Sequence, residues 1–164
     1  MDYNEILKYW FPNNDFNKFW FLGKRETDDY IKNNFYNYYL DIVNENPVIF
    51  RNSDELLTKI IVLDQFTRHI NRGSGRAYQN DSKALKLSEK YFELEYYKNH
   101  STNKIIFAIM PFRHSESIKN QKFVLDNLKF LDDGSKLFQK FQRASLVSYN
   151  TINKYGRFPD RKYS

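Results

Sequence analysis

Three arginines follow an aspartate at spacings that could place their side chains around an anion. Asp64, Arg68, Arg72 and Arg76 stand four residues apart, and residues four apart share one face of a helix. Asp64 lies four residues after Ile60, on the apolar face of the same predicted helix. An ionised carboxylate on that face must be paired or hydrogen-bonded. Since arginine binds carboxylates and phosphates bidentately, the stretch has the chemistry of an anion site.

Two interpretations of this stretch remain open. In the first, it is a structural lock, in which Asp64 pairs with Arg68 or Arg76 and caps backbone groups of the following loop. In the second, it forms the wall of a pocket whose arginines bind a carboxylate or phosphate. Spacing alone favours the lock, because structural ion-pair networks use the same residue types.

A second polar run, His114-Ser115-Glu116, follows an apolar segment. A histidine can act as an acid or a base near neutral pH, and a helix N-terminus attracts anions. Adjacent residues rarely face one another as a Ser–His–acid triad requires, so no triad is predicted. The alternative is a helix cap, with His114 as an ordinary partner of a carbonyl or an acid.

Composition narrows the remaining possibilities. The chain has 164 residues and no cysteine, which predicts a single domain over residues 1–164 and excludes disulfides and thiolate chemistry. The three histidines, His69, His100 and His114, lack metal-ligand spacing, so neither a metal nor a cofactor is expected. No segment resembles a signal peptide or a membrane span, which predicts a cytoplasmic protein without membrane contact.

The net charge of +6 comes from the C-terminal part of the chain. Residues 135–164 contain seven bases and one acid, whereas the first 134 residues contain 19 of each. Nucleic acid or another acidic partner could use this segment. A solvated basic face on the last helix is the simpler interpretation, because no nucleic-acid motif accompanies it.

Helical periodicity predicts the elements that position these residues, and no segment alternates like a strand. Ser53, Asp81 and Ser115 are predicted N-caps, and Pro111 is expected to end the fifth helix. Short connections predict a single all-α domain of about seven helices packed as antiparallel hairpins. The predicted helices cover residues 2–11, 27–43, 54–70, 81–97, 105–110, 115–131 and 135–155.

Five short motifs are spaced along the chain: Leu63-Asp64-Gln65-Phe66-Thr67-Arg68, Arg72-Gly73, Arg76-Ala77-Tyr78, His114-Ser115-Glu116 and Tyr155-Gly156-Arg157-Phe158-Pro159. Together they make the chain resemble the bacterial family called domain of unknown function 924. The resemblance covers nearly the whole chain and implies an all-α fold similar to tetratricopeptide-repeat proteins, but no biochemical activity. The chain departs from the family pattern at Thr67 (usually proline), His69 (usually asparagine), near Ser148 and at Asp160 (usually histidine).

Because the shared motifs are polar rather than apolar, the resemblance strengthens the pocket interpretation. We expect the arginines to bind an anionic small molecule or peptide, with His114 and Glu116 or Asp64 orienting it or moving a proton. The alternatives are a protein-interaction module with a tetratricopeptide-like groove, and nucleic-acid binding through the basic C-terminal segment. No motif establishes a reaction. The residues expected to converge are Asp64, Arg68, Arg72, Arg76, His114, Glu116 and Arg157.

Overall fold

The computed structural model describes residues 2–13, 15–21 and 24–161, and within these ranges the chain forms helices and no strand. The predicted all-α class is therefore confirmed. The elements are α1 (Asn4–Trp10), the 3-10 helix η1 (Lys18–Trp20), α2 (Arg25–Asn44), α3 (Ser53–Ile61), the π-helix η2 (Val62–Phe66), α4 (Thr67–Ile70), the 3-10 helix η3 (Gly75–Tyr78), α5 (Asp81–Glu93), the 3-10 helix η4 (Tyr96–Asn99), α6 (Thr102–Arg113), α7 (Ile118–Asp126), α8 (Leu128–Leu131) and α9 (Lys136–Tyr155).

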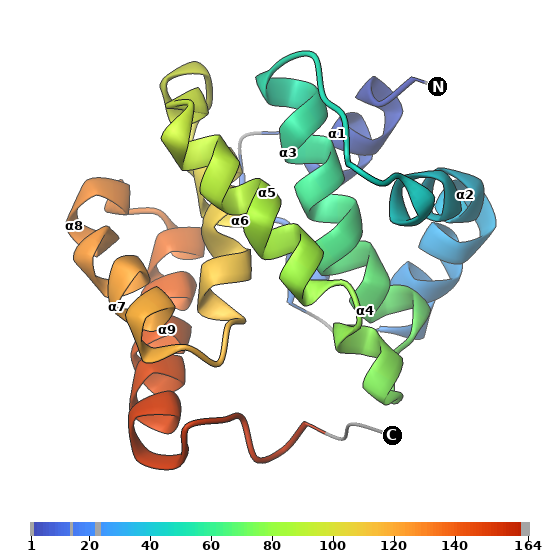
Figure 1. Cartoon of the computed structure of the whole chain (residues 1–164). Helices are drawn as coiled ribbons and strands as arrows, with labels where there is room; N and C mark the ends of the chain where they lie inside the picture. The colour runs from blue at the N-terminus through green and yellow to red at the C-terminus, as the bar shows by residue number, and fades with distance from the viewer. Residues whose placement is uncertain (1, 14, 22–23, 162–164) are drawn as a thin grey trace.

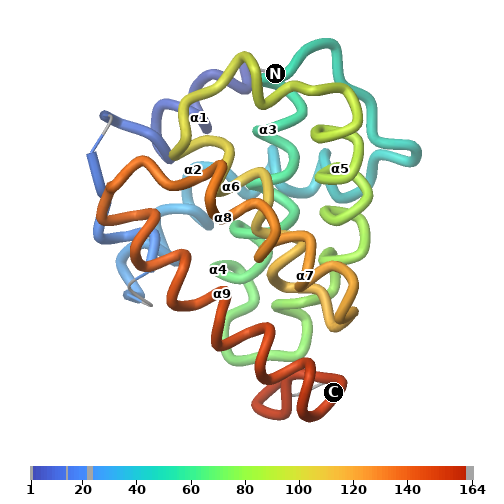
Figure 2. The backbone as a smooth tube through the Cα atoms, turned by 90° about the vertical axis from the view of Figure 1, so that its left-hand side faces the viewer, coloured from blue at the N-terminus to red at the C-terminus, as the bar shows by residue number. Residues whose placement is uncertain are grey.

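The helices pack around a central group formed by α3, α5 and α6 (Figure 1). On one side of this group α2 packs against α4, and on the other side α7 and α9 pack against each other and against α6. Figure 2 shows α9 lying across α6 and beside α7. After α9 the chain turns back across one end of the molecule toward α4 (Figure 1). The tetratricopeptide-like arrangement of hairpins stays a prediction.

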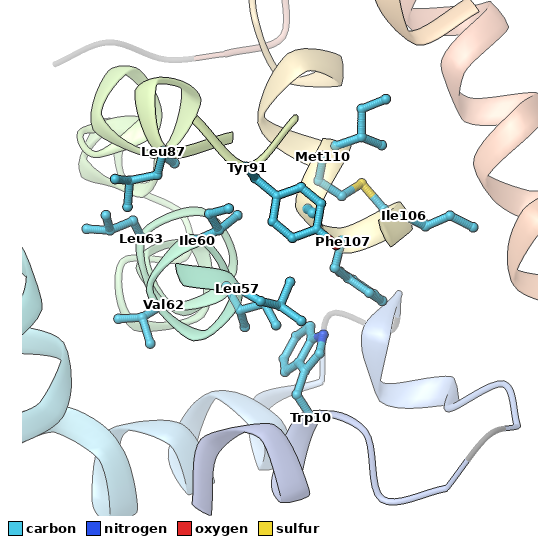
Figure 3. Packing of buried hydrophobic residues seen from close by; sticks show 14 of the residues in the cluster. Trp10, Leu57, Ile60, Val62, Leu63, Leu87, Tyr91, Ile106, Phe107 and Met110 are labelled. Carbon is cyan, nitrogen blue, oxygen red and sulfur yellow. The ribbon is translucent and has the colours of Figure 1, made fainter. Parts of the chain in front are cut away.

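Aromatic and branched side chains fill the space between these helices (Figure 3). Trp10 of α1 is fully buried, and its ring meets the Phe107 ring of α6 edge to face at a centroid distance of 5.5 Å. Leu57 and Ile60 of α3 and Tyr91 of α5 are also fully buried. The apolar face predicted for the third helix therefore faces the core, and it carries Asp64 into the protein interior with it.

The boundaries of several helices differ from the sequence prediction. Asn52, not Ser53, caps α3, because its side chain accepts a hydrogen bond of 2.9 Å from the backbone N–H three residues later. Pro111 does not end α6, which continues to Arg113. The helix predicted over residues 115–131 begins only at residue 118 and breaks at Asn127 into α7 and α8. The three extra residues at the end of α6 matter, because they place His114 at the C-cap of this helix.

Gly156 ends α9 with a positive φ of 73°, and its backbone N–H bonds the Ile152 carbonyl at 2.8 Å. A Cβ at this position would meet open space, so the cost of a side chain is backbone strain alone. We expect Gly156→Ala to lower the free energy of unfolding by about 1–2 kcal/mol, and Gly156→Asn by less, because asparagine tolerates the left-handed region. Urea denaturation checks both values, and equal losses in the two variants would contradict the strain argument.

Candidate functional site

Asp64 lies inside the π-helical segment η2, where the wider turn interrupts the helix formed by α3 and α4. Its side chain is completely buried. Gln65 Nε2 donates to Oδ2 at 2.8 Å, and His114 Nδ1 lies 2.7 Å from Oδ1. Arg68 Nη1 donates to the Asp64 main-chain carbonyl at 2.8 Å and lies 3.4 Å from Oδ1. The buried carboxylate is therefore surrounded by donors, as its burial requires.

Arg68 joins this carboxylate to a second one on α5. Its two terminal nitrogens donate to the two oxygens of Asp81 at 2.7 and 3.0 Å, in the bidentate geometry that suits a guanidinium. Asp81 was predicted to be the N-cap of α5, but Asn80 occupies the cap position and Asp81 is the first helical residue. Arg161, from the segment after α9, lies 3.7 Å from the same carboxylate. The pair Arg68–Asp81 thus fastens α4 to the start of α5.

His114, at the C-cap of α6, is held through both ring nitrogens and its main-chain oxygen. Burial first, and then the positive charge of Arg68, lower the pKa of His114 to about 3, so the ring is neutral at pH 7. Burial alone would raise the pKa of the Asp64 carboxyl, yet His114, Arg68 and Gln65 hold it below its usual range. An ionised carboxylate only accepts, so Nδ1 carries the proton and Nε2 accepts from Arg113 Nη2 at 3.2 Å.

Arg113 is the cation of this region that has no carboxylate partner in the described part of the chain. Its Nη1 donates to the hydroxyl of Ser148 on α9 at 3.2 Å, and its Nη2 donates to His114. Its Nε is buried and has no hydrogen-bond partner there. Burial lowers the pKa of Arg113 to about 10, which still leaves the guanidinium charged at neutral pH. A buried charge with an unused donor is an unusual feature that calls for an acceptor.

A second cluster of polar side chains, Asp28, His69 and Arg72, lies on the α2 side of the molecule. Arg72 Nε and Nη2 donate to the two oxygens of Asp28 at 2.6 and 2.9 Å. His69 Nδ1 lies 2.7 Å from Asp28 Oδ1, so α2 holds the end of α4 through one carboxylate. Burial lowers the pKa of His69, and this ring too is neutral at pH 7.

Side chains of both polar clusters line one cavity of about 260 Å³, which we call the arginine cavity. Its polar wall contains three guanidinium groups and two imidazoles, and its apolar wall comes from aromatic residues and a methionine. A second cavity, of about 280 Å³, shares Arg113 and His114 with the first, and its other lining residues are Tyr78 and residues of α9 and the C-terminal segment. The arginine cavity is lined by Trp20, Phe21, Gln65, Arg68, His69, Arg72, Phe107, Met110, Arg113 and His114.

The structure brings some of the predicted site residues together and leaves others apart. Asp64, Arg68 and His114 form one bonded cluster, and Arg72 lines the same cavity as Arg68 and His114. Glu116 accepts a hydrogen bond of 2.6 Å from the Phe158 backbone N–H, which fastens the C-terminal segment next to this cluster.

Arg76 and Arg157 are exposed and line neither cavity. The suggested pairing of Asp64 with Arg76 is therefore wrong, and Arg68 is the arginine that pairs with Asp64.

Sequence reasoning missed Arg113, Asp28 and His69 as parts of this site. Arg113 directly precedes His114, and a charged residue at the end of an almost wholly apolar helix was an available signal. Asp28 lies 41 residues before His69, and no local pattern in the sequence links the two. Their contact depends on how α2 packs against α4, which periodicity does not specify.

Comparison with known proteins identifies the family. The model of the family "Bacterial protein of unknown function (DUF924)" matches residues 6–163, so the chain belongs to this family and the resemblance seen in its motifs is confirmed. The solved structure of a protein of unknown function, ATU0120 from Agrobacterium tumefaciens, has a TM-score of 0.83 and 20% sequence identity. The match covers 97% of this chain and 86% of that one, and it shows a shared fold. No curated protein matches the chain.

Proposed function

We propose that the arginine cavity binds a small anionic molecule, with Arg113 as its principal charge partner. The observation that carries this proposal is the state of the three arginines in its wall. Arg68 is occupied by Asp64 and Asp81, and Arg72 is occupied by Asp28. Arg113 has a serine and a neutral histidine as partners and a buried Nε with none in the described chain. A bound carboxylate or phosphate would neutralise it with charge-assisted hydrogen bonds.

The size and the walls of the cavity support a small molecule rather than a peptide. A volume of about 260 Å³ is below the usual range for drug-sized ligands. Trp20, Phe107 and Met110 line the same cavity and offer apolar contacts to a short carbon skeleton. Catalysis is not part of the proposal, because His114 is already bonded at both ring nitrogens.

Among the helices that the structure describes, none combines the length and apolar character that crossing a membrane requires.

The two alternative functions, nucleic-acid binding and protein interaction through a groove, have less support. In the basic C-terminal segment, Lys136 and Lys140 lie over the Phe16 ring, at 4.8 and 5.6 Å from its centre. Arg161 of the same segment contacts Asp81 and the His114 carbonyl. These side chains have structural contacts, which weakens the case for nucleic acid. The polar residues line a cavity, which weakens the case for an open interaction groove.

We expect acetate, propionate, lactate or inorganic phosphate to raise the melting temperature of the wild-type protein in a concentration-dependent way. Arg113→Gln is expected to weaken that binding by about tenfold to a hundredfold, the value of one or two charge-assisted hydrogen bonds. Arg143→Gln is the matched control, because Arg143 is an exposed arginine on α9 and loses the same charge. Equal weakening in both variants, or no stabilisation by any of these anions, would overturn the proposal.

A second variant separates binding from folding. Arg113→Met keeps an unbranched apolar side chain as far as the position of Nε and removes a buried charge that has no direct carboxylate partner in the described chain. Replacing such a charge by an apolar group is commonly neutral or stabilising, so the ligand-free variant should melt no lower than the wild type. A marked loss of stability together with unchanged anion binding would assign Arg113 a structural role instead.

A further inference from the structure

His69 offers the arginine cavity a ring nitrogen that can accept a hydrogen bond. The ring lies at the end of α4, and its side chain is only 6% exposed. Asp28 engages Nδ1 at 2.7 Å, and Arg72 in turn holds Asp28 through both carboxylate oxygens. The imidazole is therefore fixed in orientation by a carboxylate that is itself fixed, which is how proteins select one tautomer of a histidine.

The tautomer follows from the chemistry of Asp28. Burial alone would raise the pKa of this carboxyl, but hydrogen bonds from Arg72 and His69 hold it below its usual value. An ionised carboxylate can only accept, so His69 Nδ1 must carry the proton and Nε2 must carry the lone pair. Nε2 has no hydrogen-bond partner in the described chain, and the ring lines the cavity. With the amide oxygen of Gln65, it is one of the acceptors in a wall whose other polar side chains are mostly donors.

We propose that His69 Nε2 accepts a hydrogen bond from a hydroxyl group on the bound anion, so that the cavity selects small hydroxycarboxylates over plain carboxylates. This inference rests on the proposed function, since it assumes that Arg113 binds the carboxylate of the same molecule. The guanidinium and the imidazole line one cavity from α6 and α4, and a short hydroxy acid presents an anion and a donor close together.

The charges around the cavity favour a hydroxycarboxylate over an amino acid or a phosphate. An α-ammonium group would also donate to Nε2, but Asp28 and Asp64 are already bonded to Arg72, Arg68 and the two histidines. An ammonium would therefore stand among guanidinium groups without a carboxylate of its own, which is unfavourable. Arg113 is the one lining arginine that lacks a carboxylate partner in the described chain, so a single negative charge is the better match. This favours a carboxylate over a doubly charged phosphate.

Matched pairs of ligands test the inference on the full chain. Titrations compare glycolate with acetate, lactate with propionate, and lactate with alanine. For the wild type we expect the hydroxy acid to bind about three- to tenfold more tightly than its plain partner, the value of one neutral hydrogen bond. Alanine should bind more weakly than lactate. Arg113→Gln should weaken lactate and propionate alike.

Two variants remove the acceptor. His69→Phe keeps a ring in the apolar part of the wall, and His69→Asn keeps a donor for Asp28 but has no atom at the place of Nε2. Both should bind propionate as the wild type does and lose the preference for lactate. Equal binding of each hydroxy acid and its plain partner by the wild type would overturn the inference and leave the proposed anion site standing. Binding of no carboxylate at all would overturn both.

Discussion

Replacing Asp64 by alanine is expected to lower the free energy of unfolding by about 3–5 kcal/mol, the usual cost of breaking a buried ion pair. The substitution takes an acceptor away from Gln65 Nε2, Arg68 Nη1 and His114 Nδ1 at once. Asp64 is completely buried, so water cannot simply replace the lost carboxylate. Arg68 would keep Asp81, which limits the loss. Urea denaturation followed by circular dichroism measures the change.

The matched control for this variant is Asp29→Ala on α2. Asp29 also faces an arginine one turn away, Arg25, but at 3.8 Å and with side-chain exposures of 55% and 94%. An ion pair of this kind contributes about 0–1 kcal/mol, so the control should unfold almost like the wild type. If the two alanine variants lose similar amounts of stability, the Asp64 network is not the structural lock that its geometry indicates.

The lock interpretation fits Arg68 of the polar stretch, whereas Arg113, the arginine that we propose for binding, lies outside that stretch. Arg68 has the contacts of a lock, since it joins two carboxylates from two helices. Arg113 has the features of a binding residue, since its charge is buried and forms no direct ion pair with a carboxylate of the described chain. In an Arg68 variant, therefore, weaker anion binding could not be distinguished from a loss of folded protein. Arg113 is the position where binding can be tested separately from folding.

Sequence periodicity was sufficient for the elements that have one buried face. The apolar stripe of residues 54–70 predicts a helix, and the chain is helical from Ser53 to Ile70. The π-helical segment within it could not be predicted, because it changes the backbone hydrogen bonding without changing the residue pattern. This segment places Asp64 where His114 can reach it, so a decisive feature of the candidate site has no separate signal in the sequence.

Pro111 is the opposite case, because a strong local signal predicted the end of a helix that in fact continues. A proline inside a helix loses one backbone hydrogen bond, and it predicts the end of a helix. Here Met110 and Phe112 on either side of it are buried, and packing on the core keeps the helix intact to Arg113. The contact between Asp28 and His69 is a third case, because it depends on helix packing alone.

Lowering the pH from 7 to 5 is expected to reduce the free energy of unfolding by about 2 kcal/mol through His114 alone. The folded-state pKa of His114 is about 3, below the ordinary value near 6.5 that the unfolded chain has. Between these values the unfolded state binds more protons, so the stabilisation present above pH 6.5 is lost as the pH falls. Burial lowers the pKa values of His69 and His100 as well, and both add to the loss.

His114→Asn isolates the contribution of this one residue, because asparagine keeps a donor for Asp64 and does not titrate. The variant should lose about 2 kcal/mol less than the wild type between pH 7 and pH 5, as measured by urea denaturation at each pH. Burial raises the pKa of Asp81, which acts in the opposite sense, but this effect is common to both proteins and cancels in the difference. Equal pH dependence in the two proteins would show that His114 titrates normally in the folded state, and the neutral, doubly bonded imidazole beside Arg113 would then be wrong.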